Sequence, residues 1–325
     1  MKAAWYRSNG LARDVLEVGD LPTPQPGPGE VRVKLHTSGV NPSDVKSRLK
    51  RPLIAERIVP HSDGGGVVDA VGDGVPSSRV GERVWVWNAQ WQRPMGTACE
   101  HVVLPAQQAV ALPDNVDFDA AACLGIPALT AVQAIHLAGP LQGKTVLITG
   151  AGNAVGHCAT QLAVLQGATV IGTAGAPARQ QHARDAGAQH VIDYQREPVA
   201  ARVADITQGR GVDVVIDMDF ASTAALLPHK VLKPHGQVVC YGSNQPGEVA
   251  VDFRTLLFES IRLTFFLVYD LTPADRDRAV QTLTGLLRAG RLRLAVGQTF
   301  ALDDIAAAHE AVEAGRVVGN VVIRL

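Results

Sequence analysis

From about Lys144 onward the chain alternates between short apolar runs and amphipathic segments, and this alternation constrains the fold more than any other feature. Residues 145–148 form a continuous apolar run, as expected of a parallel strand covered on both faces. Residues 155–166 follow with apolar side chains at helical spacing, and Gly167 provides a helix stop. Strands that alternate with helices predict right-handed β-α-β units and a doubly wound parallel sheet.

The same alternation continues to the C-terminus. Apolar runs predict further strands, and segments with helical spacing predict further helices. The predicted strands are 169–173, 190–192, 212–216, 237–241, 263–268 and 317–323, and the predicted helices are 178–186, 273–288 and 304–313.

The first 110 residues have a different pattern. Residues 31–35 and 84–87 alternate with period two, which is typical of half-buried strands. The proline-rich segment 22–29 forms neither a helix nor an interior strand, because proline lacks the backbone donor and fixes φ. Closely spaced turn signals predict a small, irregular β-barrel or sandwich here.

Length and composition exclude several classes of protein. A chain of 325 residues exceeds the usual size of one core, so two domains are expected. With 30 Lys+Arg against 31 Asp+Glu, it has no electrostatic attraction for nucleic acid or an anionic membrane. The four cysteines are far apart, which argues against a disulfide framework or a four-cysteine zinc site. Neither a secretory signal nor a membrane-spanning run is apparent, and we expect a cytoplasmic protein.

The segment 149–156, TGAGNAVG, is the sharpest chemical feature. It lies between an apolar strand and the start of a helix, where small residues let the backbone approach a pyrophosphate and the helix N-terminus offers N–H donors. The third glycine, Gly156, comes one residue later than in the strict GxGxxG motif. A glycine pattern of this kind also occurs in plain tight turns, but its place within successive β-α-β units favours dinucleotide binding.

The end of the second strand of this region bears on the choice of coenzyme. An NAD-specific fold places Asp or Glu there to accept from the ribose 2′-hydroxyl. Residues 172–178 contain no acid, and Arg179 follows, which could pair with a 2′-phosphate. The alternative for Arg179 is a solvated helix residue; the absence of an acid favours NADPH.

Several motifs, in their order and spacing, resemble the zeta-crystallin type of quinone oxidoreductase, a zinc-free branch of the medium-chain dehydrogenase/reductase superfamily. The motifs run nearly from end to end: residues 39–44 (GVNPSD), 60–72, 81–84 (GERV), 125–131 (GIPALTA), 150–156, 172–175 (GTAG) and 241–243 (YGS). The resemblance implies an α/β protein with a GroES-like β-rich catalytic domain, residues 1–122 and 268–325. It implies a Rossmann NADPH-binding domain of residues 123–267, with coenzyme and substrate between the domains.

The resemblance also implies which residues contact the coenzyme. Asn41 and Thr130 would lie near the nicotinamide, the loop 151–156 near the pyrophosphate, and the remaining residues near the adenosine phosphate or the coenzyme's flank. The implied set is Asn41, Thr130, Ala151, Gly152, Asn153, Ala154, Val155, Gly156, Thr173, Gly175, Arg179, Tyr194, Gly242, Ser243 and Asn320.

The zinc ligands of many relatives are replaced in this chain. Their first ligand is a cysteine where Asn41 stands, and their His-Glu pair falls at Ser62 and Asp63. His61 is one residue out of register and is better read as a structural or surface histidine. We therefore expect no metal.

Without a metal, hydride transfer to an electrophilic quinone or α,β-unsaturated carbonyl is the favoured reaction. Asn41 is the candidate donor to the developing oxyanion. Relatives often carry a tyrosine where Lys46 stands, so Lys46 is either a proton donor or a charged residue on a solvated face, and the second is slightly favoured. Trp87 and Trp91 could stack on a flat substrate, whereas core packing of the tryptophans that begin at Trp85 is an equal alternative.

Two further hypotheses compete with the quinone or enone reductase. Enoyl reductases that act on thioester-linked or polyketide-type enones share this architecture, and the fold also supports non-catalytic NADPH-binding proteins. For assembly, the resemblance implies a homodimer, because relatives commonly pair edge strands of their Rossmann sheets. The apolar strand 263–268 could extend a sheet across a two-fold axis, or could equally be interior.

Overall fold

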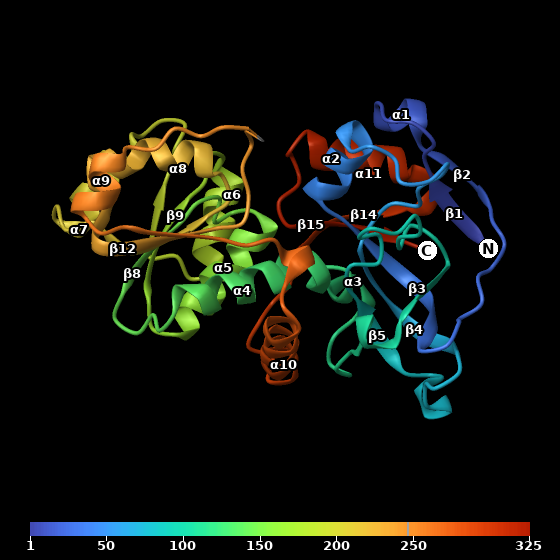
Figure 1. Ribbon diagram of the computed structural model, residues 1–325. Helices are drawn as coiled ribbons and strands as arrows, with labels where there is room; N and C mark the ends of the chain where they lie inside the picture. Colours follow the sequence, from blue (N-terminus) through green and yellow to red (C-terminus); the bar gives the residue numbers. More distant parts are fainter. Residues whose placement is uncertain (246) are drawn as a thin grey trace. The chain divides into compact units, whose positions relative to one another are not determined.

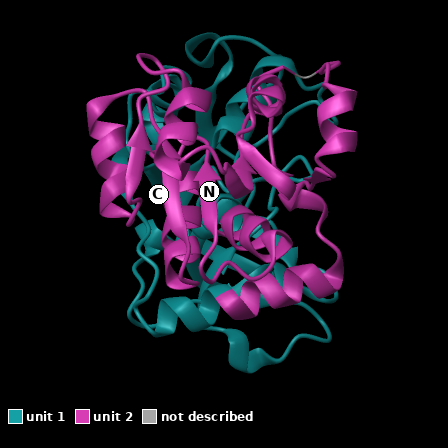
Figure 2. Cartoon of the chain, turned by 90° about the vertical axis from the view of Figure 1, so that its left-hand side faces the viewer, with its two compact units in different colours: residues 1–127, 283–325 teal, residues 128–282 magenta. Residues whose placement is uncertain are grey.

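Two sheets, one mainly antiparallel and one parallel, dominate the structure, a computed structural model that describes residues 1–245 and 247–325 (Figure 1). The chain divides into two compact units, Met1–Pro127 with Leu283–Leu325 (unit 1) and Ala128–Thr282 (unit 2), which Figure 2 colours separately. The expected division placed both boundaries earlier, at 122/123 and 267/268. The difference at the second boundary reflects helix α10, Pro273–Arg288, which runs from unit 2 into unit 1 as one continuous helix.

Unit 1 is built on a seven-stranded, mainly antiparallel sheet. Its strand order is β14-β15-β3-β4-β5-β7, and β6 pairs with β3. Its strands are β3 (Glu30–Val40), β4 (Asp63–Val71), β5 (Arg83–Val86), β6 (His101–Pro105), β7 (Ala109–Ala111), β14 (Val296–Ala301) and β15 (Asn320–Arg324). A separate ribbon pairs β1 (Lys2–Trp5) with β2 (Glu17–Asp20).

The helices of unit 1 are α1 (Ala12–Val15), α2 (Pro42–Lys50), α3 (Phe118–Ala121) and α11 (Ile305–Glu313). Alternation along β3 turns Val31, Val33 and Leu35 into the core, where they are almost fully buried. The C-terminal strand β15 pairs antiparallel with β3, so the last residues of the chain belong to the same sheet as the first hundred. This confirms the predicted GroES-like, β-rich fold class.

Unit 2 holds a six-stranded, all-parallel sheet in the order β10-β9-β8-β11-β12-β13. Its strands are β8 (Thr145–Ile148), β9 (Thr169–Thr173), β10 (His190–Ile192), β11 (Val212–Asp217), β12 (Leu232–Cys240) and β13 (Arg262–Phe265). Its helices are α4 (Leu129–Ala138), α5 (Ala154–Leu165), α6 (Pro177–Asp185), α7 (Val199–Thr207), α8 (Phe220–Leu226), α9 (Phe253–Phe258) and most of α10. The strand order reverses next to β8, which is the doubly wound order of a Rossmann fold, as predicted.

The continuous apolar run of β8 is explained by its central position. Val146, Leu147 and Ile148 have no exposed surface, because β9 and β11 flank the strand and helices cover the sheet. In the part of the chain that the structure describes, no helix is long and apolar enough to cross a membrane.

Some element boundaries differ from the sequence-based expectation for local reasons. The predicted strand 317–323 begins only at Asn320, because Gly319 has a φ of +94° and turns the chain into the strand. The predicted strand 263–268 is the shorter β13, after which the backbone enters a 3₁₀ turn at Val268–Asp270. The predicted helix 273–288 matches α10 at both ends.

Candidate functional site

The glycine-rich loop between β8 and α5 forms a cradle that only small residues permit. A Cβ on Gly156 would lie 2.2 Å from the carbonyl oxygen of Gly150, and a Cβ on Gly152 would lie 2.4 Å from that of Arg179. Asn153, the N-cap residue of α5, makes no side-chain capping bond to the first-turn amides. The loop therefore combines close backbone approach with amides at a helix N-terminus, which is the arrangement that binds a pyrophosphate.

Hydrogen bonds to both neighbouring strands hold the loop. Thr173, at the end of β9, accepts the Gly150 N–H on its hydroxyl at 3.0 Å and the Ala151 N–H on its carbonyl at 3.0 Å. Thr149 donates its hydroxyl to Asp217 Oδ1 at 2.9 Å, at the end of β11. Burial raises the pKa of Asp217, and the hydrogen bonds from Thr223, Asp219 and Thr149 oppose this. The predicted cofactor residues Ala151–Gly156 and Thr173 thus lie together.

Arg179 lies at the edge of the same loop. Its guanidinium Nη1 donates to Asn153 Oδ1, which brings a positive charge from α6 to the start of α5. No acid follows β9: the chain continues through Ala174 and Gly175. A Cβ on Gly175 would come within 2.9 Å of the ring of Tyr194, a half-exposed residue, so the predicted pair Arg179 and Tyr194 flanks the end of β9.

The other predicted cofactor residues occupy different surroundings. Thr130, in α4, is almost fully buried. Gly242 and Ser243 follow β12, and the Ser243 hydroxyl donates to Asp219 Oδ1 at 3.3 Å. Asn320 begins β15 in unit 1, and its amide Nδ2 donates to the carbonyl of Ala295 at 2.9 Å.

In unit 1, Asn41 is held between two buried carboxyl groups. Its side-chain Nδ2 donates to Asp63 Oδ2 at 2.9 Å, and its backbone N–H donates to Asp44 Oδ2 at 2.7 Å. Asp63 Oδ2 also accepts the Ile126 N–H at 3.0 Å. Asn41 is the N-cap residue of α2, so the expected oxyanion donor lies where β3 ends and α2 begins.

Burial changes the acidity of both carboxyls. Desolvation raises the pKa of Asp44 to about 7, against the hydrogen bonds from Asn41 and the charge of Arg51. Desolvation, followed by the nearby Asp44 charge, raises the pKa of Asp63 well above its ordinary value. Neither residue was among the predicted site residues. The Asn-Pro-x-Asp spacing signals a capped helix, which could have pointed to Asp44, but no local pattern marks the contact with Asp63.

A buried hydrogen-bond chain lies behind Asp63. Thr97 donates its hydroxyl to the Asp63 carbonyl at 2.6 Å, and Ser38 Oγ lies 2.7 Å from the Thr97 hydroxyl and 2.8 Å from His61 Nδ1. His61 Nε2 lies 2.9 Å from Nε2 of His309, from α11. Because a carbonyl only accepts, each hydroxyl donates toward Asp63, so His61 carries its proton on Nδ1 and His309 on Nε2.

This chain explains why His61 is not a surface residue. Both of its ring nitrogens are used, the side chain has no exposed surface, and its φ is +76°. Desolvation lowers the pKa of His61 to about 3, and it lowers the pKa of His309 well below the ordinary value, assisted by the charges of His61 and Arg48. His61 therefore lies in the interior of unit 1 and not at its surface.

The remaining candidates separate into buried and accessible residues. Lys46 lies on the exposed face of α2. Trp85 has no exposed surface and belongs to the packing of unit 1, whereas Trp87 and Trp91 are partly exposed. The guanidinium carbon of Arg51 stands 5.4 Å from the ring centroid of Trp91.

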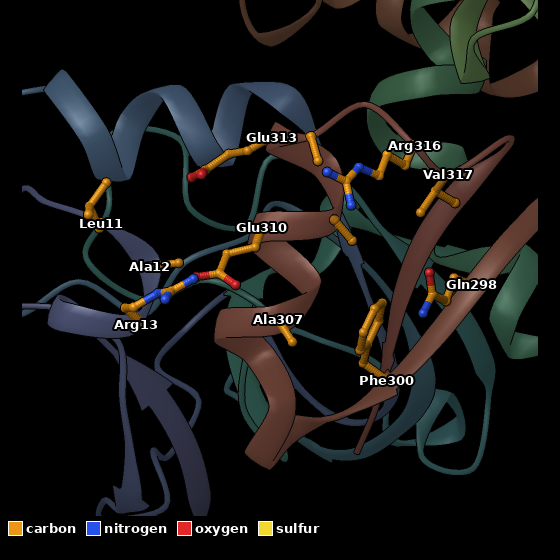
Figure 3. Close-up of a pocket in the computed structure, with 12 residues that line it drawn as sticks. Leu11, Ala12, Arg13, Gln298, Phe300, Ala307, Glu310, Glu313, Arg316 and Val317 are labelled. Atoms are coloured by element: carbon orange, nitrogen blue, oxygen red, sulfur yellow. The ribbon is translucent and has the colours of Figure 1, made fainter. Parts of the chain in front are cut away.

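A pocket of about 840 Å³ occurs elsewhere in unit 1, between α1, α11 and β14 (Figure 3). Phe300 and Ala307 line it, and the ion pair between Arg13 and Glu310, 2.8 Å long, lies at its edge. It includes none of the predicted site residues. Across residues 1–245 and 247–325, no group of three or more His, Cys, Asp or Glu side chains could hold a metal ion.

Comparison with known proteins identifies the family. Residues 27–114 match the family model of the alcohol dehydrogenase GroES-like domain, and residues 154–285 match the model described as zinc-binding dehydrogenase. The chain is 33% identical to a quinone oxidoreductase of Pseudomonas aeruginosa over 95% of both chains. It is 30% identical to a 2-haloacrylate reductase of a Burkholderia species over 99% of this chain and 98% of that protein.

Solved structures show the same architecture. A structure described as an NAD-dependent alcohol dehydrogenase superposes with a TM-score of 0.90 at 29% identity, and a mycobacterial protein in complex with NADPH superposes with a TM-score of 0.89 at 30% identity. Each comparison covers the whole of both chains. The fold and the site define an oxidoreductase of the medium-chain dehydrogenase/reductase superfamily. Within it, the chain belongs to the zeta-crystallin-like quinone oxidoreductase family.

The buried histidines predict a loss of stability in acid. Because the pKa of His61 is lowered on folding, the unfolded chain binds more protons between about pH 6.5 and pH 3, and stability falls as the pH drops through this range. We expect His61 alone to account for about 2 kcal/mol of the loss between pH 7 and pH 5. In His61→Asn, which suits the left-handed backbone, urea unfolding should change less between these two pH values.

His235→Asn is the matched control, because His235 is exposed and also has a positive φ, of +62°. It should keep the wild-type pH dependence. An unchanged slope in His61→Asn would contradict the burial of a neutral His61.

Proposed function

We propose that the protein reduces a quinone or an α,β-unsaturated carbonyl with NADPH, without a metal ion. The observation that carries this proposal is the pyrophosphate cradle at residues 150–156. The buried amide donor Asn41 and the membership in a family of nicotinamide-dependent reductases support it. The 2-haloacrylate reductase relative supports activated alkenes as a second substrate class beside quinones.

The predicted coenzyme-binding residues, most of them in unit 2, bind and orient the coenzyme in this proposal. The amides of the 150–156 loop hold the pyrophosphate, Arg179 and Tyr194 hold the 2′-phosphate, and Thr130, Gly175, Gly242, Ser243 and Asn320 complete the contacts. NADPH, when bound, supplies the hydride.

The residues of unit 1 act on the substrate. Asn41 donates an amide hydrogen to the oxygen on which negative charge develops, and Trp87 and Trp91 border the substrate. The exposed position of Lys46 favours a solvated charge over a proton donor for this residue.

Metal independence is supported by the donor set. Asn41 stands at the position of the first zinc ligand of relatives, and His61 uses both ring nitrogens in hydrogen bonds to Ser38 and His309. A quinone or enone is already electrophilic, so it needs an oxyanion donor rather than a Lewis acid. The even charge balance supports a small-molecule substrate rather than a nucleic-acid or membrane partner, and the location that we propose is the cytoplasm.

The proposed reaction is tested by following NADPH oxidation against quinones, small enones and enoyl thioesters. We expect turnover with the first two classes, unaffected by prior dialysis against a zinc chelator. Turnover confined to enoyl thioesters would favour the enoyl reductase alternative. Tight NADPH binding without turnover on any substrate would indicate a non-catalytic protein, and loss of activity on chelation would contradict metal independence.

Coenzyme choice is tested at Arg179. In Arg179→Ala we expect NADPH affinity to fall by about 10- to 100-fold, the contribution of a charge-assisted hydrogen bond, and NADH affinity to stay nearly constant. Arg184→Ala, on the exposed side of the same helix α6, is the control and should change neither affinity. An unaltered NADPH/NADH ratio in Arg179→Ala would remove this residue from the binding site.

We also propose that two copies pair through β13. This strand is at the edge of the parallel sheet. Its last residue, Phe265, is 56% exposed, and Leu267, which follows the strand, is 48% exposed. The neighbouring helix α9 exposes Phe253, Leu257 and Phe258. An unpaired edge next to exposed apolar side chains is suited to a self-complementary contact across a two-fold axis.

The dimer is tested with Phe265→Glu, which brings two like charges together at a two-fold contact. We expect light scattering coupled to size exclusion to give a dimer for the wild type and a monomer for this variant. Ile54→Glu, at an equally exposed position in unit 1, should remain a dimer. A monomeric wild type, or a dimeric Phe265→Glu, would contradict the interface.

A further inference from the structure

Asp63 is a buried carboxyl whose two oxygens have different surroundings. The side chain has no exposed surface at the start of β4. Oδ2 accepts two N–H groups, from Asn41 Nδ2 at 2.9 Å and from the Ile126 backbone at 3.0 Å. Oδ1 has no hydrogen-bond partner among the described residues.

The two bonds to Oδ2 decide how the Asn41 amide is turned. A backbone N–H can only donate, so Oδ2 acts as an acceptor toward Ile126, and its 2.9 Å contact with Asn41 Nδ2 is a second acceptor contact. An acceptor in contact with a side-chain amide requires the nitrogen, and not the oxygen, of that amide. Asn41 is therefore fixed with Nδ2 toward Asp63, while its own backbone N–H is held by Asp44.

Two further contacts, with Thr97 and with Gly125, hold Asp63 in place. Thr97 donates to its carbonyl at 2.6 Å. Gly125 approaches its Oδ1 so closely that a Cβ at residue 125 would lie 2.3 Å from this oxygen and 2.9 Å from the Val86 carbonyl. Only glycine at residue 125 leaves the carboxyl in this position.

We propose that Asp63 is the positioning residue of Asn41, and that it acts as a hydrogen-bond acceptor that turns the amide nitrogen into its working orientation. This inference rests on the proposed role of Asn41 as the oxyanion donor. Asp63 touches neither substrate nor coenzyme in this account; its effect on the reaction passes through one amide.

The charged and titratable groups around this pair agree with an acceptor role that does not depend on an ion pair. Asp44 is the charged group that acts on Asp63, and Arg51 acts on Asp44. Tyr6 is influenced by Asp44, Arg51 and Arg48. No cation forms an ion pair with Asp63 among the described residues. The pKa of Asp63 is raised by burial and then by Asp44, which agrees with the absence of an ion-pair partner among the described residues.

The experiment is a double-mutant cycle on the full-length enzyme with a quinone that the wild type reduces. Asn41→Ala should lower kcat by about 100-fold, the usual effect of losing one oxyanion donor. Asp63→Leu, which keeps the branched arrangement of side-chain atoms but has no acceptor, should lower kcat by about as much. The variant with both changes should be no slower than Asn41→Ala, because Asp63 acts through Asn41.

Asp63→Asn is the conservative rescue. Its side-chain oxygen can accept from both Asn41 and Ile126, so we expect it to recover most of the kcat lost in Asp63→Leu, with an unchanged KM for NADPH. Gly125→Ala gives a second perturbation if Asp63→Leu does not fold: it should lower kcat in the wild-type background and have no further effect in Asn41→Ala.

Ser38→Ala controls for a buried hydroxyl lost in the same unit. It should lower the melting temperature without changing kcat. The proposal is overturned if the losses at Asn41 and Asp63 multiply, or if Asp63→Asn is as slow as Asp63→Leu at an unchanged melting temperature. An inactive wild type would instead contradict the proposed function, and a fully active Asn41→Ala would contradict the role of Asn41.

Discussion

The buried carboxyl group of Asp63, which has no exposed surface, is the constraint on which the proposed role of Asn41 in unit 1 depends. A buried carboxyl must find donors inside the protein, because leaving its oxygens without partners costs several kcal/mol. Here the donors come from Asn41, where β3 ends and α2 begins, and from the backbone at Ile126, more than sixty residues away in the chain. One side chain thus joins separate segments of unit 1 and fixes the orientation of the candidate oxyanion donor.

Other buried polar side chains near Asp63 are also hydrogen-bonded to one another inside the protein. The chain from Thr97 through Ser38 and His61 to His309 connects the first strands with the C-terminal helix α11. The direction of donation along this chain follows from a single carbonyl that can only accept, and burial favours the neutral form of both histidines. In unit 2 the constraint is steric. Glycine is required at residues 152 and 156, because backbone atoms come too close there for any side chain.

The sequence predicted most of the fold because the signals for it are local. Helix α10 was predicted at both ends, and the parallel strands followed from apolar runs separated by helical spacing. The start of β15 was predicted too early, because the apolar residues 317 and 318 precede a left-handed Gly319 that no periodicity reveals. The second domain boundary differed because α10 continues across it.

Site prediction divides in the same way. The loop 150–156, Thr173 and Arg179 were predicted as site residues because a motif and a strand end mark them, and the structure brings them together. The contacts of Asp63 with Asn41 and of His309 with His61 were not predicted, since these partners are 22 and 248 residues away in the chain. The sequence around Asp63 does not indicate that this side chain lies next to Asn41. The contact follows from the pairing of β3 with β4.

In the proposed reaction the protein moves a hydride directly from the nicotinamide to carbon or oxygen of an electrophilic substrate. The most direct measurement uses NADPH deuterated at C4, in either stereochemical position, with an α,β-unsaturated ketone in ordinary water. We expect one of the two labelled coenzymes to deliver its deuterium to the β-carbon, while the α-carbon receives a proton from the solvent. Product without deuterium from both labelled coenzymes would contradict it.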